Sequence, residues 1–309
     1  MEQNIVEIGS TANTNRLPFP VSGALVTLFD DAGGVYSYIE NPSKAGSYLL
    51  SGVEGVPGRT YHIEVTTPEG NVYQSRKEKM PDQAGTIATN YEILFEEFTD
   101  REGTVSFEPF IKVYANATLP QGNGPLYLKW GVNEVFKLTP TDFPDPFNMP
   151  PPNCYIDQNA DPQRVVLFDG SDVKATSFDN MLVASRIIDW SFVERHYFTT
   201  TQSSLTPEAY DYWRKVNILA NQVGSIFDTP PAEISGNMSN INDPSEKVLG
   251  YFQAANQTYD RFYILPINLP FFLSLECTYD SQAEDFAYPQ RCLNCIEEPN
   301  SSYVPPDWF

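Results

Sequence analysis

The residues best suited to chemistry in this sequence are four cysteines, Cys154, Cys277, Cys292 and Cys295, all in the second half of the chain. Cys292 and Cys295 have the Cys-x-x-Cys spacing of zinc sites and redox centres. A zinc site needs a second close pair, which the other two cysteines do not provide, and a redox pair opens a helix after a strand. An even number of cysteines in one half favours two disulfides, with three pairings open and zinc or redox chemistry as the alternatives.

Disulfides imply an oxidising compartment and therefore export. The sequence begins with MEQN, which lacks the basic region and apolar core of a signal peptide. We therefore expect a leader that has been removed. No segment approaches the roughly 20 apolar residues that a membrane-spanning helix needs. The longest apolar run, Phe262–Leu275, is interrupted by Pro266 and Pro270.

Other catalytic groups are scarce. The two histidines, His62 and His196, lie in alternating strand patterns with aromatic neighbours, which favours structural roles over general-base catalysis. The sequence contains no motif for a nucleophilic serine, a zinc protease or a phosphate-binding loop. Adjacent carboxylates such as Glu96 and Glu97 mean little among 40 acidic residues. We predict no catalytic residue, no metal and no cofactor.

The charge of the chain restricts its partners. Its 40 acidic and 19 basic side chains give a formal net charge of −21. Such a field repels phosphate backbones and anionic membrane surfaces, so nucleic acid is excluded as a partner. The charge is expected to keep the protein soluble, and cation capture is the alternative interpretation.

The first 80 residues have the pattern of a small antiparallel sandwich. Thr60–Thr66 alternates, with Tyr61, Ile63 and Val65 on one face. Turn residues recur about every ten positions, which is typical of immunoglobulin- or transthyretin-like sandwiches. A charged stretch with Pro and Gly follows, so we predict a first domain over 1–80 and a second over 86–309. Further strands are expected at Ala24–Phe29, Val35–Ile39, Gly46–Leu50 and Val72–Ser75.

The rest of the chain predicts a larger antiparallel β domain with one main α-helix at about 206–223. Thr206 is a suitable N-cap, Pro207 a suitable first residue and Gly224 a suitable end. The apolar stripe through Trp213 is expected to face the core. Six prolines in Thr139–Asn153 predict a stiff loop. Strands are expected at Tyr91–Phe95, Thr104–Phe110, Ile111–Tyr114, Tyr127–Leu138, Val165–Phe168, Val183–Ile188, Phe192–Thr200, Ile234–Ile241, Val248–Ala254, Arg261–Leu265 and Phe271–Leu275.

The segment Leu205–Phe252 resembles the signature of the Bacteroidota family DUF4249. Members of that family typically carry a motif similar to LtxEAyxFWkxlkxqxexxGslFDpxPsxixGNixnvxdpxexVLGYF. The C-terminal cysteines with Pro306 and Asp307 also resemble the family's tail, although Trp308-Phe309 reverses its last two residues. The matching positions taken as a structural signature include Trp213, Gly224, Phe227, Asp228, Gly236, Asn237, Gly250, Tyr251 and Phe252.

The resemblance implies an outer-membrane lipoprotein on the cell surface, lipid-anchored in its native form. It also implies a non-enzymatic role as an accessory or ligand-capturing partner of a TonB-dependent transporter, with a small ligand or glycan as a further partner. The first domain resembles carboxypeptidase-regulatory-like modules. No catalytic residues are established for the family. Two alternatives remain: a secreted or surface hydrolase acting on glycans, and a purely structural subunit of a surface complex.

Overall fold

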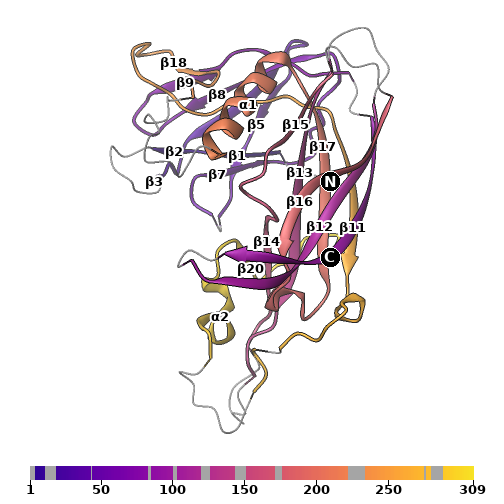
Figure 1. Cartoon of the computed structure of the whole chain (residues 1–309). Coiled ribbons are helices and arrows are strands. Elements are labelled where there is room, and N and C mark those ends of the chain that lie inside the picture. Colours follow the sequence, from indigo (N-terminus) through magenta and orange to yellow (C-terminus); the bar gives the residue numbers. More distant parts are fainter. Residues whose placement is uncertain are drawn as a thin grey trace.

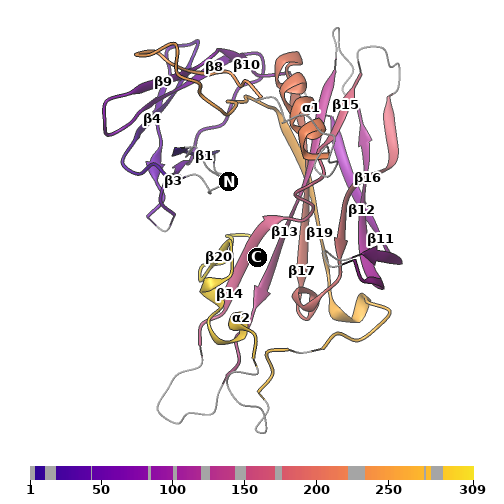
Figure 2. The same cartoon turned by 60° about the vertical axis from the view of Figure 1, so that its left-hand side comes forward.

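The structure is a computed structural model of the chain. It describes residues 4–10, 19–42, 44–82, 85–99, 103–119, 126–142, 151–170, 176–221, 234–274, 276–279 and 288–309. Antiparallel sheets dominate and form two lobes, with helix α1 (Pro207–Asn221) between them (Figures 1 and 2). The predicted fold class, mainly β with one main helix, is confirmed. Among the described residues, no helix is long and apolar enough to cross a membrane.

The N-terminal lobe is a sandwich of two sheets. Three strands in the order β1-β7-β6 face a sheet of six, in which β18-β9-β8-β4-β5 are in order and β10 pairs with β8. In β8, Tyr61, Ile63 and Val65 are buried and their neighbours only partly so, as the alternation predicts. The strands are β1 (Asn4–Glu7), β2 (Gly9–Ser10), β3 (Phe19–Pro20), β4 (Leu25–Asp30), β5 (Val35–Ser37), β6 (Ile39–Glu40), β7 (Ser47–Leu50), β8 (Thr60–Thr66), β9 (Val72–Ser75), β10 (Glu78–Lys79) and β18 (Met238–Asn240).

The second lobe packs two further sheets around the larger core. One has the order β11-β12-β16, and the other has β19-β17-β13-β14-β20, with β15 beside β13. Ile111, Trp130 and Phe198 belong to this core and are each at most 1% exposed. The strands are β11 (Thr86–Thr99), β12 (Val105–Thr118), β13 (Tyr127–Leu138), β14 (Cys154–Asn159), β15 (Val166–Asp169), β16 (Ser177–Ile187), β17 (His196–Leu205), β19 (Gln257–Ile264) and β20 (Ser301–Ser302). The short helices are η1 (Trp190–Phe192), η2 (Pro266–Asn268), α2 (Gln290–Leu293) and η4 (Cys295–Glu297).

Helix α1 begins as its sequence predicts. The Oγ1 atom of Thr206 accepts a hydrogen bond of 3.1 Å from the backbone N–H of Ala209, which satisfies a donor that the helix itself leaves unpaired. The helix then packs on both sides: Tyr210 lies on Tyr127 of β13, with ring centroids 4.8 Å apart. Tyr212 lies on Tyr251 at the same separation, 4.8 Å. The predicted end at Gly224 lies outside the described residues.

Residues 234–257 return from the second lobe to the first. β18 pairs with β9 at one edge of the six-stranded sheet, and Met238, Phe252 and Ala254 pack against the sandwich core. The division into residues 1–80 and 86–309 stays a prediction. This segment of the second predicted unit nevertheless shares a sheet and a core with the first.

Several predicted strands differ from the structure. Val248–Ala254 forms no strand, because no described strand pairs with it, and Ile234–Ile241 is reduced to β18. Phe271–Leu275 also lacks a strand over its described residues, 271–274. The two strands predicted over 104–114 are one strand, β12, which continues through Pro109 while the carbonyl oxygen of that residue accepts from Ile188 N. β14 was not predicted.

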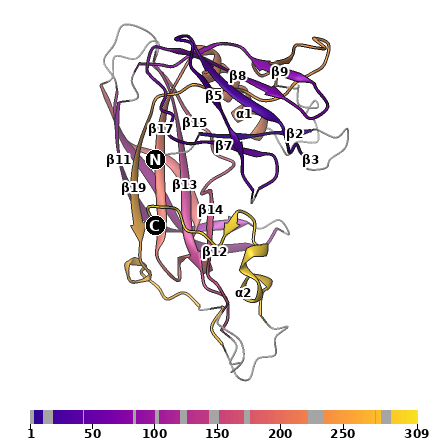
Figure 3. The same cartoon turned by 180° about the vertical axis from the view of Figure 1, so that it is seen from behind.

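The prediction of two disulfides is confirmed. Cys154 pairs with Cys295, and Cys277 pairs with Cys292, so the two cysteines of the Cys-x-x-Cys motif bond to different partners. The first bond closes a loop of 141 residues and ties the C-terminal segment to β14. Figure 3 shows this segment, with α2 and β20, packed beside β14. A cross-link over so long a loop removes much entropy from the unfolded chain.

Candidate functional site

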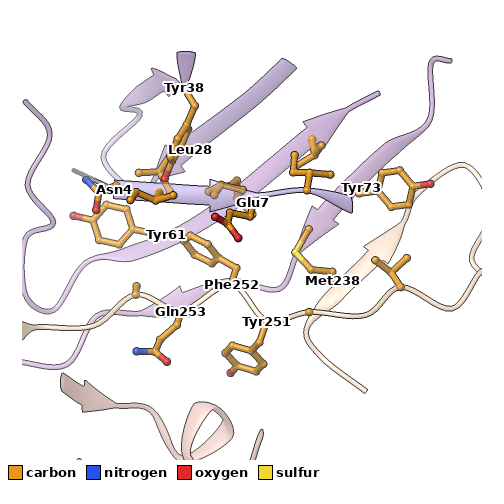
Figure 4. A pocket seen from close by; sticks show the side chains of 18 of the residues that line it. Asn4, Glu7, Leu28, Tyr38, Tyr61, Tyr73, Met238, Tyr251, Phe252 and Gln253 are labelled. Atoms are coloured by element: carbon orange, nitrogen blue, oxygen red, sulfur yellow. The ribbon is translucent and has the colours of Figure 1, made fainter. Parts of the chain in front are cut away.

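A cavity lies where the sandwich meets the second lobe. Its volume is about 750 Å³, within the range of small-molecule and peptide sites. One wall is the sandwich, with β1 along its length and Leu28, Tyr61 and Ile63 behind it. The opposite wall is the segment 246–255, and Figure 4 shows Tyr251, Phe252 and Gln253 across from β1.

Lys129 and Trp213 form the part of the cavity wall that belongs to the second lobe. The Nζ atom of Lys129 lies 3.6 Å from the centroid of the Trp213 ring, a cation–π contact. The Trp213 indole N–H donates a hydrogen bond of 2.7 Å to Gln253. Lys129 also pairs in register with Ser203 of β17, whose hydroxyl accepts from Gln257 at 3.0 Å. Polar side chains from three strands thus form a row below the helix.

Lys129 is a half-buried cation with no carboxylate partner among the described residues. Burial lowers the pKa of its ammonium group from the usual 10.5 to about 8, because the charged form loses hydration. The site can therefore pair with an acidic group, or hold a neutral amine at mildly alkaline pH. The sequence analysis missed this residue, because its burial depends on α1 covering the sheet.

Glu78 of β10 joins the two lobes through hydrogen bonds. This carboxylate is 5% exposed and accepts from Thr206 at 2.9 Å, from Asn237 at 3.4 Å and from the hydroxyl of Tyr251. Burial raises the pKa of the Glu78 carboxyl, and the bonds from Tyr251 and Thr206 offset this only in part. Glu78 thus connects the helix cap to the segment that forms the far wall of the cavity.

The local geometry explains the residue types at the signature positions Gly236, Gly250 and Asn237. A Cβ atom at Gly236 would lie 1.5 Å from the carbonyl oxygen of Gly250, so only glycine fits. Gly250 itself has a φ of 106°, in the region that favours glycine. Asn237 accepts from Phe252 N at 2.8 Å and donates to Phe252 O at 2.8 Å, which fixes the far wall of the cavity.

The structure brings part of the predicted signature together. Four of these residues line the cavity: Trp213, Gly250, Tyr251 and Phe252. Gly236 and Asn237 contact Gly250 and Phe252 of its far wall. Trp213 of α1 was predicted to face the core, but it is half-buried, belongs to no described core cluster and lines the cavity. The signature residues Gly224, Phe227 and Asp228 lie outside the described residues.

The two histidines lie apart, in different lobes. His62 stacks on Phe29 with ring centroids 4.9 Å apart, and burial with the nearby Lys77 charge lowers its pKa. His196 is fully buried, with its Nε2 atom 3.1 Å from Glu134. Neither histidine lines the cavity.

Glu134 is the centre of a buried charged network in the second lobe. Its oxygens accept from Arg186 Nε at 3.1 and 3.2 Å and from Gln158 at 2.7 Å, in addition to the contact with His196. Burial alone would raise the pKa of Glu134, but His196 and Arg186 outweigh it and hold the pKa below its usual range. All these groups have partners, so the network is suited to stability.

Two carboxylates line the cavity, but other groups already engage both. Glu7 forms an ion pair of 2.6 Å with Lys44, and Glu246 accepts hydrogen bonds from Tyr73 and Asn240. Neither arrangement presents an acid beside a base. The geometry is therefore better suited to binding than to hydrolysis.

The chain is thus a mainly β protein of two lobes with one helix between them. The signature segment forms a wall of the cavity at their junction. A family model described as "Domain of unknown function (DUF4249)" matches residues 3–261. The chain belongs to this family. No curated protein and no solved structure matches it.

Proposed function

We propose that this protein is a non-enzymatic, cell-surface outer-membrane lipoprotein that acts as an accessory partner of a TonB-dependent transporter. The observation that supports this proposal is the cavity of about 750 Å³ between the lobes, which we assign as the binding site. Its wall combines apolar and aromatic side chains with the half-buried cation Lys129, and the carboxylates of Glu7 and Glu246 are already engaged. Such sites hold a ligand or a partner segment without transforming it.

The disulfides support an exported location for this proposal. Both bonds lie in the second lobe, and they require an oxidising compartment to form and persist. The net charge of −21 opposes direct adsorption to an anionic membrane, which suits a protein held at a membrane by a lipid anchor or a partner.

Co-purification tests the proposal. The tagged native protein is extracted from outer membranes in mild detergent, and the proteins that accompany it are identified by mass spectrometry. We expect a TonB-dependent barrel at near-stoichiometric amounts, retained in 0.5 M salt. Recovery of the protein from the outer membrane without any such barrel, or its recovery from the cytoplasm with four free thiols, overturns the proposal.

A further inference from the structure

The sandwich has one sheet edge that opens directly into the cavity. Within the described residues, β1 pairs with β7 on one side only and ends its three-stranded sheet. In an antiparallel ladder, alternate residues direct their N–H and C=O groups to the other side. Asn4–Glu7 line the cavity along this free edge, which ends where Gly9 and Ser10 pair with β3. An unpaired edge is a template for another strand.

The two sheets of the sandwich also differ in size. Three strands face six, so the smaller sheet covers only part of the inner face of the larger one. Ile63 and Val65 of β8 are core residues and yet line the cavity, together with Val6 and Ile8. Ile63 and Val65 are already 3% and 5% exposed, so one more strand beside β1 would extend the smaller sheet next to these side chains.

The far wall presents a second edge. Asn237 bonds both the N–H and the C=O of Phe252, which copies the pair of bonds between two opposed strand residues. In such a backbone the groups of the flanking residues point the opposite way, and both flanking residues, Tyr251 and Gln253, line the cavity. Neither makes a backbone hydrogen bond to any described residue. Tyr251–Gln253 therefore present a short backbone edge to the cavity, whereas Gly250, with a φ of 106°, interrupts the extended conformation predicted for Val248–Ala254.

We propose that the cavity is a strand-acceptor slot, in which an extended segment of a partner polypeptide pairs with β1 on one side and with residues 251–253 on the other. The proposal rests on the proposed function, because it names the kind of partner that the same cavity binds. Main-chain hydrogen bonds to both edges supply affinity in this mode of recognition, and side-chain pockets supply specificity.

The size and lining of the slot specify its occupant. Each residue of a strand within a packed sheet fills roughly 160 Å³, so a cavity of 750 Å³ holds about five residues. The side chains that face Ile63 and Val65 must be apolar, and the alternate ones point away from the sandwich core. A small apolar ligand is the other candidate occupant, and it would leave both backbone edges unpaired.

Hydrogen exchange of a tethered strand tests the proposal. The probe is the peptide Lys-Val-Thr-Val-Thr-Val-Lys, joined to the N-terminus of the full chain by a flexible Gly/Ser linker of about eight residues. Tethering raises the effective concentration to the millimolar range, so even a generic sequence can occupy the slot. The matched control carries the same linker and a peptide with its central Val and the following Thr replaced by proline, which removes two donors.

We expect the Val/Thr tether, and not the proline tether, to slow amide exchange about tenfold or more in both segments 4–10 and 248–255. The free Val/Thr peptide at millimolar concentration should protect the same amides of the untethered protein. The variant Ala254→Phe adds bulk to the far wall and should remove both effects. Because Ala254 also packs against the sandwich core, far-ultraviolet circular dichroism of the untethered variant verifies that it is folded.

Equal exchange with the two tethers overturns the strand slot. So does protection confined to one segment, because a small-molecule site does not need both edges. Co-purification separates the two proposals: a transporter recovered without peptide protection leaves the proposed function standing and removes the slot. Peptide protection without a transporter supports the slot and contradicts the proposed partner.

Discussion

Glu78 and Glu134 are both buried glutamates, yet their surroundings shift the pKa of the two carboxyl groups in opposite directions. Glu134 faces the cation Arg186 together with His196, and its pKa is lowered. Glu78 faces only the neutral donors of Thr206, Asn237 and Tyr251, and its pKa is raised. The first sits inside one lobe and the second sits between the lobes. A charged network thus fixes the core of one lobe, while the junction depends on weaker neutral bonds that border the cavity.

Removing the carboxylate of Glu134 should cause the largest effect. In Glu134→Ala, Arg186 and His196 lose a buried partner, and breaking such a network costs roughly 3–5 kcal/mol of unfolding free energy. Urea unfolding at pH 7, followed by far-ultraviolet circular dichroism, measures the loss. The exposed Glu69→Ala is the matched control and should change stability by less than about 0.5 kcal/mol. A loss below about 1 kcal/mol in Glu134→Ala would show that the network contributes little.

Glu78→Ala should cost less and act locally. Its partners are hydroxyl and amide groups that need no counter-charge, so we expect a loss of about 1–3 kcal/mol. Hydrogen exchange should rise at the start of α1 and in residues 234–257, and it should stay unchanged in β13 and β17. Uniformly faster exchange in both lobes would contradict the assignment of Glu78 to the junction.

The contributions of the two glutamates to the unfolding free energy should change with pH in opposite directions. Because the folded pKa of Glu134 is lowered, its contribution is present above the unfolded value near 4.5 and is lost as the pH falls. Because the folded pKa of Glu78 is raised, the folded state holds the proton more tightly, and its contribution is lost as the pH rises from about 4.5 through the folded pKa.

Urea midpoints between pH 3 and 7 for wild type, Glu134→Gln and Glu78→Gln check both signs. Relative to wild type, Glu134→Gln should be less destabilised as the pH falls, whereas Glu78→Gln should be less destabilised as the pH rises. Each unit of pKa shift corresponds to about 1.4 kcal/mol. Parallel curves for the two variants would remove the contrast between the lobes.

Local patterns predicted the elements, and long-range geometry decided the rest. The alternation of Thr60–Thr66 and the Thr206 cap depend on neighbours in sequence, and both predictions are confirmed. The prediction of a strand at Val248–Ala254 was wrong, because a strand needs a pairing partner, which the residues of the segment do not specify. The cysteines were recognised, but their pairing depends on how β14 approaches the C-terminal segment.

The candidate site was only partly predictable for the same reason. Trp213 was predicted as a core residue of a helical stripe, but it is half-buried and contacts Lys129 and Gln253 at the cavity wall. Glu78 and Lys129 carry no local signal, since nothing in their immediate sequence shows that Glu78 becomes buried and Lys129 half-buried. Their roles arise when α1 and residues 246–257 cover the sheets to which they belong.

Lys129 extends the comparison to a half-buried cation without a carboxylate partner among the described residues, and we expect the smallest effect from its removal. In Lys129→Met the contact with Trp213 is lost, which costs about 0.5–2 kcal/mol, but the cost of burying a charge is lost with it. The two largely cancel, so stability at pH 7 should change by less than about 1 kcal/mol. The pH profile is the sharper test, since its sign is fixed.

The folded pKa of Lys129 is about 8, and that of an unfolded lysine is near 10.5. Between these values the unfolded chain binds more protons, so the wild type should gain stability relative to Lys129→Met as the pH rises from 7 to 9.5. Urea unfolding at these two pH values measures the gain, with Lys44→Met, whose ammonium pairs with Glu7 at the surface, as the control. A Lys129→Met profile that runs parallel to wild type would mean that the ammonium is hydrated, and it would remove Lys129 from the cavity wall as a group that binds acids.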